Sequence, residues 1–179
     1  MTDISAGLAD LGLVQAASFK QTAFVVRDIE ASAAAFWEEF RIGPWTGWTL
    51  TQDLFRESHF RGAPGQFSFR HALAWKDGAQ FELVQPLAGD SLFSEHLERH
   101  GEGLHHIGMY VADIAAARSQ MEARGFRAVQ GASGFGADGD GCFCYFETDR
   151  PIHTIVEIIQ APQGRRPAHF VYPALDQRL

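Results

Sequence analysis

Short apolar runs typical of β-strands, each followed by an alanine-rich stretch typical of a helix, occur twice along the chain. The first copy begins at Gln21 with QTAFVVRDI, and the second begins 85 residues later at His106 with HIGMYVADI. In both copies the apolar run leads into Asp-Ile, and the side-chain oxygens of Asp28 and Asp113 can cap the first turn of a following helix. A repeat at this interval indicates two structural units of the same kind.

Each copy closes with a second matching phrase, FELVQP at residues 81–86 and VEIIQAP at residues 156–162. Both are predicted strands that stop at a proline, because proline cannot continue a ladder of hydrogen bonds. Further strand-like stretches lie at residues 65–75 and 141–148. We therefore predict an α+β fold of two tandem βαβββ modules. The predicted division is an N-terminal arm (1–17), a first module (18–87), a linker helix (88–102), a second module (103–162) and a C-terminal tail (163–179).

Composition and charge narrow the choice of partners. The formal net charge is -7, and the single basic cluster, Arg165-Arg166, gives no electrostatic basis for binding a nucleic acid. No run of roughly 18 apolar residues is present, and the N-terminus lacks the pattern of a signal peptide, so we expect a soluble cytoplasmic protein with no membrane partner. Cys142 and Cys144 stand two apart on a predicted strand, where a disulfide is geometrically unfavourable, and are expected to be small buried hydrophobes.

Four polar residues occupy equivalent points of the repeat. Gln21 and His106 begin the first strand of each copy, and Glu82 and Glu157 lie in the last strand. Each glutamate is flanked by apolar residues, so alternation directs its carboxylate to the opposite face of the sheet. A carboxylate that faces into a concave sheet needs a partner, and a divalent metal is an efficient one. The alternative is an exposed face on which both glutamates are solvated.

The sequence GLHHIGMYVADI at residues 103–114, with QTAFVVRDIEAS and the two strand ends, resembles the vicinal oxygen chelate superfamily. This superfamily includes glyoxalase I, methylmalonyl-CoA epimerase, bleomycin-resistance proteins and extradiol dioxygenases, and the resemblance is strongest to the glyoxalase and epimerase branch. It covers residues 19–162. It implies a curved mixed sheet around a central metal-binding cavity, with one divalent ion (Zn, Ni, Co, Mn or Fe). The implied ligands are Gln21, Glu82, His106 and Glu157.

One departure from the epimerase pattern bears on function. The first ligand position there is usually histidine, whereas Gln21 resembles the Gln, Glu, His, Glu set of some glyoxalases I. A single histidine argues against an iron-dependent dioxygenase, whose site has two. The resemblance therefore implies a metal-dependent isomerase, epimerase or lyase that moves a proton next to a metal-bound carbonyl or enediolate of a small molecule. Glu157 is the first candidate for the catalytic base and Glu82 the second.

Two other functions stay open: a non-catalytic protein that sequesters a small molecule, and a metal-free isomerase or cyclase on the same fold. The substrate and its binding residues are not identified by any motif. Open sheet edges, which proteins of this class bury by pairing, favour a homodimer.

Several further residues have two interpretations each. His105 is expected to point away from His106 and to pack or to support it, while His71 reaches the cavity in one register and is exposed in the other. His153 is expected in a turn. The glycine-rich residues 134–141 are a predicted hairpin loop and candidate lid. Candidates for an apolar substrate wall, or for core or dimer contacts, are residues 43–48, Phe55, Phe60 and Phe67.

Overall fold

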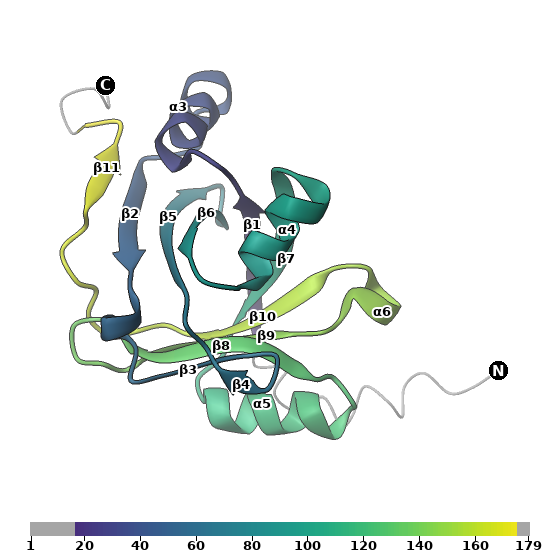
Figure 1. Cartoon of the computed structure of the whole chain (residues 1–179). Helices are drawn as coiled ribbons and strands as arrows, with labels where there is room; N and C mark the ends of the chain where they lie inside the picture. Colours follow the sequence, from purple (N-terminus) through teal and green to yellow (C-terminus); the bar gives the residue numbers. More distant parts are fainter. Residues whose placement is uncertain (1–16, 175–179) are drawn as a thin grey trace.

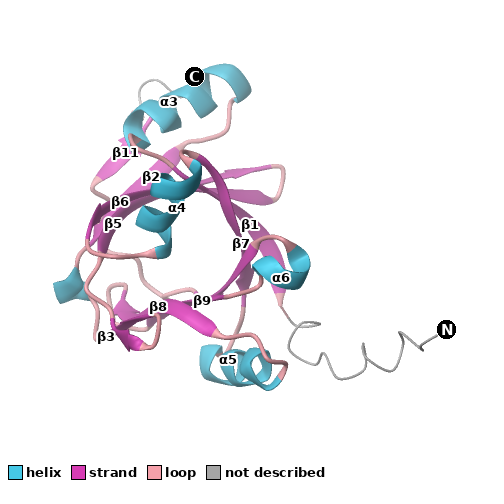
Figure 2. Ribbon diagram, turned by 45° about the vertical axis from the view of Figure 1, so that its right-hand side comes forward, coloured by secondary structure: helices cyan, strands magenta, loops and turns pink. Residues whose placement is uncertain are grey.

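The computed structural model describes residues 17–174, which form one mixed sheet of eleven strands (Figure 1). The strand order is β11-β2-β5-β6-β1-β7-β10-β9-β8-β3-β4. The sheet curls strongly, with α3 and α5 on its outer side (Figure 2). This architecture confirms the predicted α+β fold. The expected N-terminal arm lies, except for Ala17, outside the described residues.

The two modules have the same order of elements. The first contains β1 (Ser18–Val25), α3 (Ile29–Phe40), β2 (Trp45–Leu50), β5 (Ser68–Lys76) and β6 (Ala79–Ala88). The second contains β7 (Gly103–Tyr110), α5 (Ile114–Ala123), β8 (Ala128–Phe135), β9 (Gly141–Phe146) and β10 (Ile155–Gln160). In each module the first strand runs parallel to the last, and the antiparallel pair β1–β7 joins the modules. The helix α4 (Leu92–His100) lies between the modules, and α6 (Asp149–Ile152) precedes β10.

Matching residues start the two long helices in the same way. Asp28 accepts hydrogen bonds from the backbone N–H groups of Glu30 and Ala31, and Asp113 accepts one from Ala116. The glutamine that ends each repeat phrase has an equivalent role. Gln85 Oε1 accepts a bond of 3.2 Å from the N–H of Ile29, and Gln160 Oε1 accepts one of 3.1 Å from the N–H of Ile114. These bonds satisfy N–H groups that a helix leaves unpaired at its first turn.

A hairpin of the first module and a strand of the C-terminal tail each extend the edge of the sheet beside the opposite module. The hairpin of β3 (Glu57–Phe60) and β4 (Ala63–Pro64), which follows the 3-10 turn η1 (Gln52–Leu54), pairs with β8. β11 (Phe170–Tyr172) pairs with β2 at the other edge. The C-terminal tail, expected to be peripheral, thus adds a strand to the sheet. Because both edges end in strands of two or three residues, the open-edge argument for a homodimer loses its basis, and the dimer stays a prediction.

A glycine in β2 permits its pairing with β11. A Cβ atom at Gly47 in β2 would overlap the ring of Phe170, which packs across this position from β11. The absence of a side chain at Gly47 therefore leaves room for the Phe170 ring, while the backbones of β2 and β11 pair with each other. Phe170 and Tyr172 join the apolar cluster beneath α3.

Aromatic residues fill the inside of the curled sheet. Phe55, Phe67, Phe69, Phe93 and Phe143 belong to one buried cluster, with ring centroids of neighbouring pairs 5.0–6.5 Å apart. Two separate clusters lie beneath α3 and α5. Phe55 and Phe67, candidates for a substrate wall, are core residues, and Phe60 packs against the same cluster.

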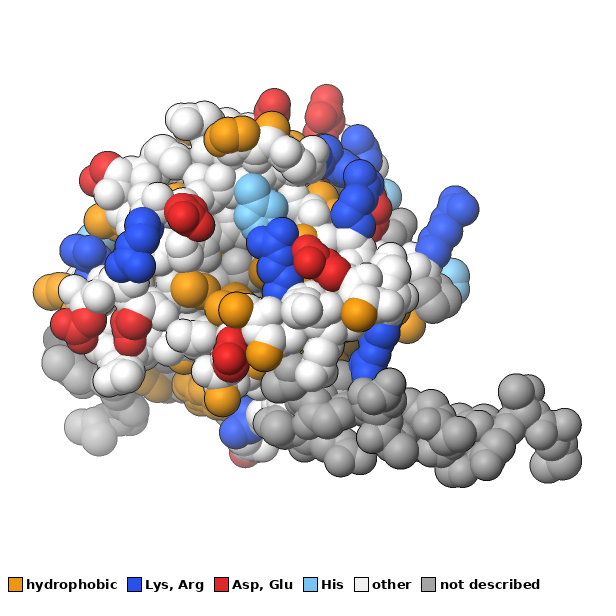
Figure 3. Space-filling model, turned by 90° about the horizontal axis from the view of Figure 1, so that it is seen from below, with side chains coloured by type: hydrophobic (Ala, Val, Ile, Leu, Met, Phe, Trp, Pro, Cys, Tyr) orange, Lys and Arg blue, Asp and Glu red, His pale blue; other side chains and the backbone are white. Residues whose placement is uncertain are grey.

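Charged side chains of both signs are mixed on one face of the molecule (Figure 3). The face shown in Figure 3 carries interspersed acidic and basic side chains, with no continuous basic patch on its described atoms. Within residues 17–174, no helix is long and apolar enough to cross a membrane.

Candidate metal site and adjoining pocket

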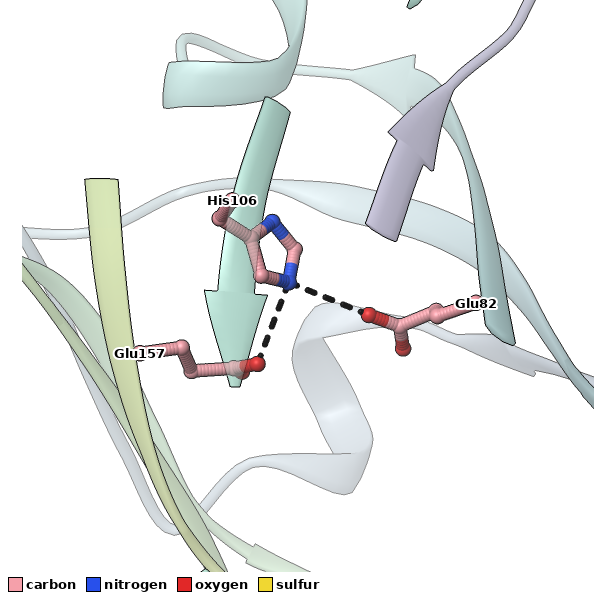
Figure 4. A group of neighbouring side chains, drawn as sticks. All are labelled: Glu82, His106 and Glu157. Carbon is pink, nitrogen blue, oxygen red and sulfur yellow. Dashed lines mark ion pairs between the residues drawn. The ribbon is translucent and has the colours of Figure 1, made fainter. Parts of the chain in front are cut away.

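Three of the four predicted ligand residues meet at one buried point inside the sheet (Figure 4). Glu82 lies on β6, His106 on β7 and Glu157 on β10. The imidazole Nε2 of His106 is 3.2 Å from Oε2 of Glu82 and 3.2 Å from Oε2 of Glu157. Ligand atoms bound at about 2.0–2.2 Å to a common ion are separated by comparable distances. The three side chains could therefore hold a metal ion.

The fourth predicted residue, Gln21, lies beside them on β1. Its register partner on β7 is Gly108, and a Cβ there would overlap the Gln21 amide, so this glycine makes room for the side chain. Gln21 Nε2 donates a 3.0 Å bond to Gln80 Oε1, which also accepts a 2.6 Å bond from the Tyr110 hydroxyl. The bond from Nε2 to Gln80 thus fixes the orientation of the Gln21 amide, and Oε1 of this amide makes no hydrogen bond to the described residues. Gln21, Glu82 and Glu157 all line one cavity of about 40 Å³.

The donor atoms of this cluster give a direct test of whether the site fits a cation. Gln21 Oε1 is buried and has no hydrogen-bond partner among the described residues. Glu82 Oε2, His106 Nε2 and Glu157 Oε2 are likewise buried and contact one another only as ion pairs of 3.2 Å, without a hydrogen bond. Leaving a buried polar atom unpaired costs about 1–3 kcal/mol. All four atoms are electron-pair donors for a divalent ion, with a nitrogen and oxygen set that suits Zn, Ni, Co, Mn or Fe. The donor chemistry of the site therefore fits such an ion.

Charge coupling makes the two glutamates chemically different. Burial raises the pKa of Glu82, but the imidazoles of His106 and His71 outweigh it and lower this pKa to about 2. Burial likewise raises the pKa of Glu157, and here the opposing charge of His106 does not overcome it. Burial lowers the pKa of His106, yet the carboxylates of Glu157 and Glu82 raise it to about 9. Glu157 is therefore the more basic carboxylate.

Two histidines support the candidate ligands. His71, on β5, places Nδ1 3.0 Å from Oε1 of Glu82, so this carboxylate faces an imidazole on each oxygen. His105 places Nδ1 2.8 Å from Nδ1 of His106. With Nε2 of His106 directed at the candidate site, its Nδ1–H donates to His105, which fixes the tautomer and the ring plane. His71 thus reaches the cavity, and His105 supports its neighbour.

This support predicts a measurable loss of metal affinity. His105→Phe keeps a buried ring but removes the acceptor for His106 Nδ1–H, so we expect metal to bind about 10–100-fold more weakly. Competition with a chromophoric chelator measures the dissociation constant. His100→Phe, on the exposed end of α4, is the matched control and should change it little. Unchanged affinity in His105→Phe would show that the pair of histidines does not orient the ligand.

A second cavity, of about 330 Å³, opens beside the candidate metal site. Trp48 lines it from β2, so the predicted substrate wall at residues 43–48 is represented by this side chain, while Trp45 is in the core. Residues of the C-terminal tail form much of the opposite wall. Sequence reasoning missed them, and the one signal that could have found them is the basic pair Arg165-Arg166. The lining residues shared with the small cavity are Leu50, His71, Phe135, Pro162 and Arg165.

Residues 136–140 connect β8 to β9 beside this pocket, so the predicted loop at residues 134–141 is shorter than expected. Ala137 donates its N–H to the Gly164 carbonyl at 2.8 Å, and Asp140 Oδ2 accepts a 2.9 Å bond from the N–H of Gln163. The loop is therefore tied to the C-terminal segment, and its role as a lid stays a prediction. His153 lies in an exposed turn with a positive φ of 58°. Both cysteines are free, and Cys144 is buried as expected, whereas Cys142 is only half-buried.

Comparison with known proteins places this fold in a family. Residues 20–146 match the family model described as the Glyoxalase/Bleomycin resistance protein/Dioxygenase superfamily, and the chain belongs to that superfamily. No curated protein sequence matches significantly.

Solved structures of methylmalonyl-CoA epimerases have a similar fold. The enzyme from Streptomyces coelicolor, in complex with 2-nitronate-propionyl-CoA, has a TM-score of 0.60 and 17% identity over 80% of this chain and 96% of that one. The enzyme from Mycobacterium tuberculosis has a TM-score of 0.60 and 18% identity over 80% and 88%. An epimerase in complex with methylmalonyl-CoA and NH4+ has a TM-score of 0.60 and 15% identity over 83% of this chain and 97% of that one. At these identities the likeness shows the fold.

Proposed function

We propose that this protein is a metal-dependent isomerase, epimerase or lyase of the glyoxalase-like class, which moves a proton at the carbon next to a carbonyl group of a small organic substrate. The observation that carries the proposal is the cluster of four buried donor atoms, two of them carboxylate oxygens, of which three belong to residues that line one small cavity beside a substrate-sized pocket. Similarity to methylmalonyl-CoA epimerases supports proton transfer as the type of reaction.

In this proposal Gln21, Glu82, His106 and Glu157 hold one divalent ion. Such an ion would supply Lewis-acid stabilisation of the negative charge that develops on a carbonyl oxygen when the neighbouring carbon loses a proton. The Gln80 and Tyr110 side chains hold the Gln21 amide so that its oxygen serves as a ligand. His105 does the same for the His106 ring.

Glu157 is the proposed general base. A base must be basic enough to accept a proton near the working pH, and in the metal-free protein burial raises the pKa of the Glu157 carboxyl. Release of this carboxylate from the ion when substrate binds would make that basicity available. Glu82 is a poorer base, because His71 and His106 lower its pKa to about 2. We therefore assign Glu157 to proton transfer and Glu82 to holding the ion, with His71 fixing the Glu82 carboxylate.

Hydrogen exchange in deuterated water tests this function even while the natural substrate is unidentified. Metal-loaded protein is incubated with a panel of 2-oxo and 2-hydroxy carbonyl compounds, and proton NMR follows the signal of the α-hydrogen. We expect the protein to wash deuterium into the α-position of at least one compound that it binds. If several compounds bind and none exchanges, a sequestering function replaces this one. Exchange that survives complete removal of metal by a chelator would instead establish a metal-free isomerase.

A further inference from the structure

The C-terminal segment from Pro162 to His169 forms a fixed wall of the larger cavity. It leaves the second module at β10 and crosses to β2, where β11 lies beside it in Figure 1. Trp48 Nε1 donates a 2.8 Å bond to the Arg166 carbonyl, the N–H of His169 donates one of 2.8 Å to the Gly47 carbonyl, and the N–H of Thr49 donates one of 2.7 Å to His169 Nδ1. Together with the two bonds to residues 136–140, these contacts hold the segment at both ends.

The cavity behind this wall is small and mainly apolar. Its volume of about 330 Å³ lies at the lower end of the roughly 300–1,000 Å³ typical of small-molecule sites. Its contact with the small cavity that Glu82 and Glu157 line is direct, because the two cavities share lining residues. A ligand here can therefore reach the candidate catalytic carboxylate with one end. The main apolar lining residues are Trp48, Leu50, Leu54, Phe135, Pro162 and Pro167.

Arg165 adds an unbalanced positive charge at the junction. Its guanidinium carbon lies 4.9 Å from the centroid of the Trp48 ring, a stacking distance that limits where the charge can be. Arg165 lines both cavities. Among residues 17–174, no carboxylate lies within ion-pair distance of this guanidinium, although the protein as a whole carries a charge of -7. A free guanidinium beside an apolar cavity is suited to a carboxylate, which it can bind with two parallel hydrogen bonds.

We infer that the substrate is a small carboxylic acid whose apolar body fills the pocket and whose carboxylate binds Arg165. The other end of the molecule, with its carbonyl group, then extends towards Glu157. His169, whose Nδ1 accepts the N–H of Thr49, lines the same pocket. This inference rests on the proposed function and adds the chemical class of the substrate.

A direct binding experiment tests the carboxylate contact apart from any turnover. The probe is 4-oxo-4-phenylbutanoate, an aromatic keto acid whose carboxylate is two methylene groups away from the ketone, compared with its methyl ester. Isothermal titration of metal-loaded wild type should show the acid binding at least about tenfold more tightly than the ester. Arg165→Gln should lose this preference by weakening the acid while leaving the ester unchanged.

Arg41→Gln is the matched control, since it removes an equal charge from an arginine that also stacks on a tryptophan, Trp37, outside the pocket. It should keep the preference for the acid. Equal binding of acid and ester by the wild type, or a preference that persists in Arg165→Gln, would overturn the inference. The inference would also be overturned if propionyl-CoA bound more tightly than the acid and Arg165→Gln left this binding unchanged, because a thioester would then be recognised by other contacts.

The outcome separates the two proposals. If acid binding depends on Arg165 but no bound compound exchanges deuterium, the pocket assignment stands and the isomerase function fails. If acid and ester exchange equally well, in wild type and in Arg165→Gln, the isomerase function stands and the pocket assignment fails.

Discussion

His106→Ala should yield a protein that retains almost no divalent metal after purification, whereas the wild type should retain close to one ion per chain. His106 is the single nitrogen donor of the candidate site, and its Nε2 lies 3.2 Å from both carboxylates, so its loss leaves two oxygens of like charge and one amide. Elemental analysis of dialysed protein measures the metal content. Full retention in the variant would remove His106 from the site.

The same prediction has a signature in pH. In metal-free protein the pKa of His106 is raised to about 9, so at neutral pH the imidazole is protonated and must lose this proton when it binds a metal. Metal uptake by the wild type should therefore release about one proton per ion in weakly buffered solution, and the metal affinity should fall as the pH decreases below 9. His153→Asn, in an exposed turn where asparagine tolerates the positive φ, should behave like the wild type.

The sequence predicted the parts of the fold that the repeat contains twice. Gln21 and His106 lie at equivalent points inside the adjacent strands β1 and β7, and not at the strand starts as expected, while Glu82 and Glu157 lie inside β6 and β10, which flank that pair. Once the register is set, strand alternation decides on which face of the sheet each of these residues lies. The repeat indicated that these four residues are equivalent, and the family resemblance implied that they share a site, whereas their approach in space depends on the long-range pairing of β6, β1, β7 and β10.

The parts that occur once could not be predicted in this way. β4 and β11 have two and three residues, too few to show a period, and each belongs to an edge segment that pairs with the other module. Their positions depend on long-range packing, such as that of Phe170 over Gly47, which leaves little trace in local composition. The wall of the larger cavity consists of such a segment. For this reason the candidate metal site was predicted from the sequence, while Arg165 and the cavity that it lines were not.

The two carboxylates should respond differently to the same substitution. Glu157→Gln keeps the size of the side chain and one oxygen donor but cannot accept a proton, so it should bind metal and substrate while turnover falls by a factor on the order of 10² or more. Glu82→Gln should act mainly on metal retention, because it removes the carboxylate that His71 and His106 hold between them. The rate of deuterium exchange at saturating substrate, measured together with metal content, separates these effects.

The contrast between the variants makes the assignment of the base testable. A fall in exchange that accompanies loss of metal in both variants would mean that the glutamates act only as ligands. Exchange at the wild-type rate in metal-loaded Glu157→Gln would exclude Glu157 as the base. The expected pattern is a metal-loaded, substrate-binding and inactive Glu157→Gln beside a metal-depleted Glu82→Gln. We expect this pattern because, in the metal-free protein, the imidazoles of His106 and His71 lower the pKa of Glu82 to about 2, whereas burial raises that of Glu157.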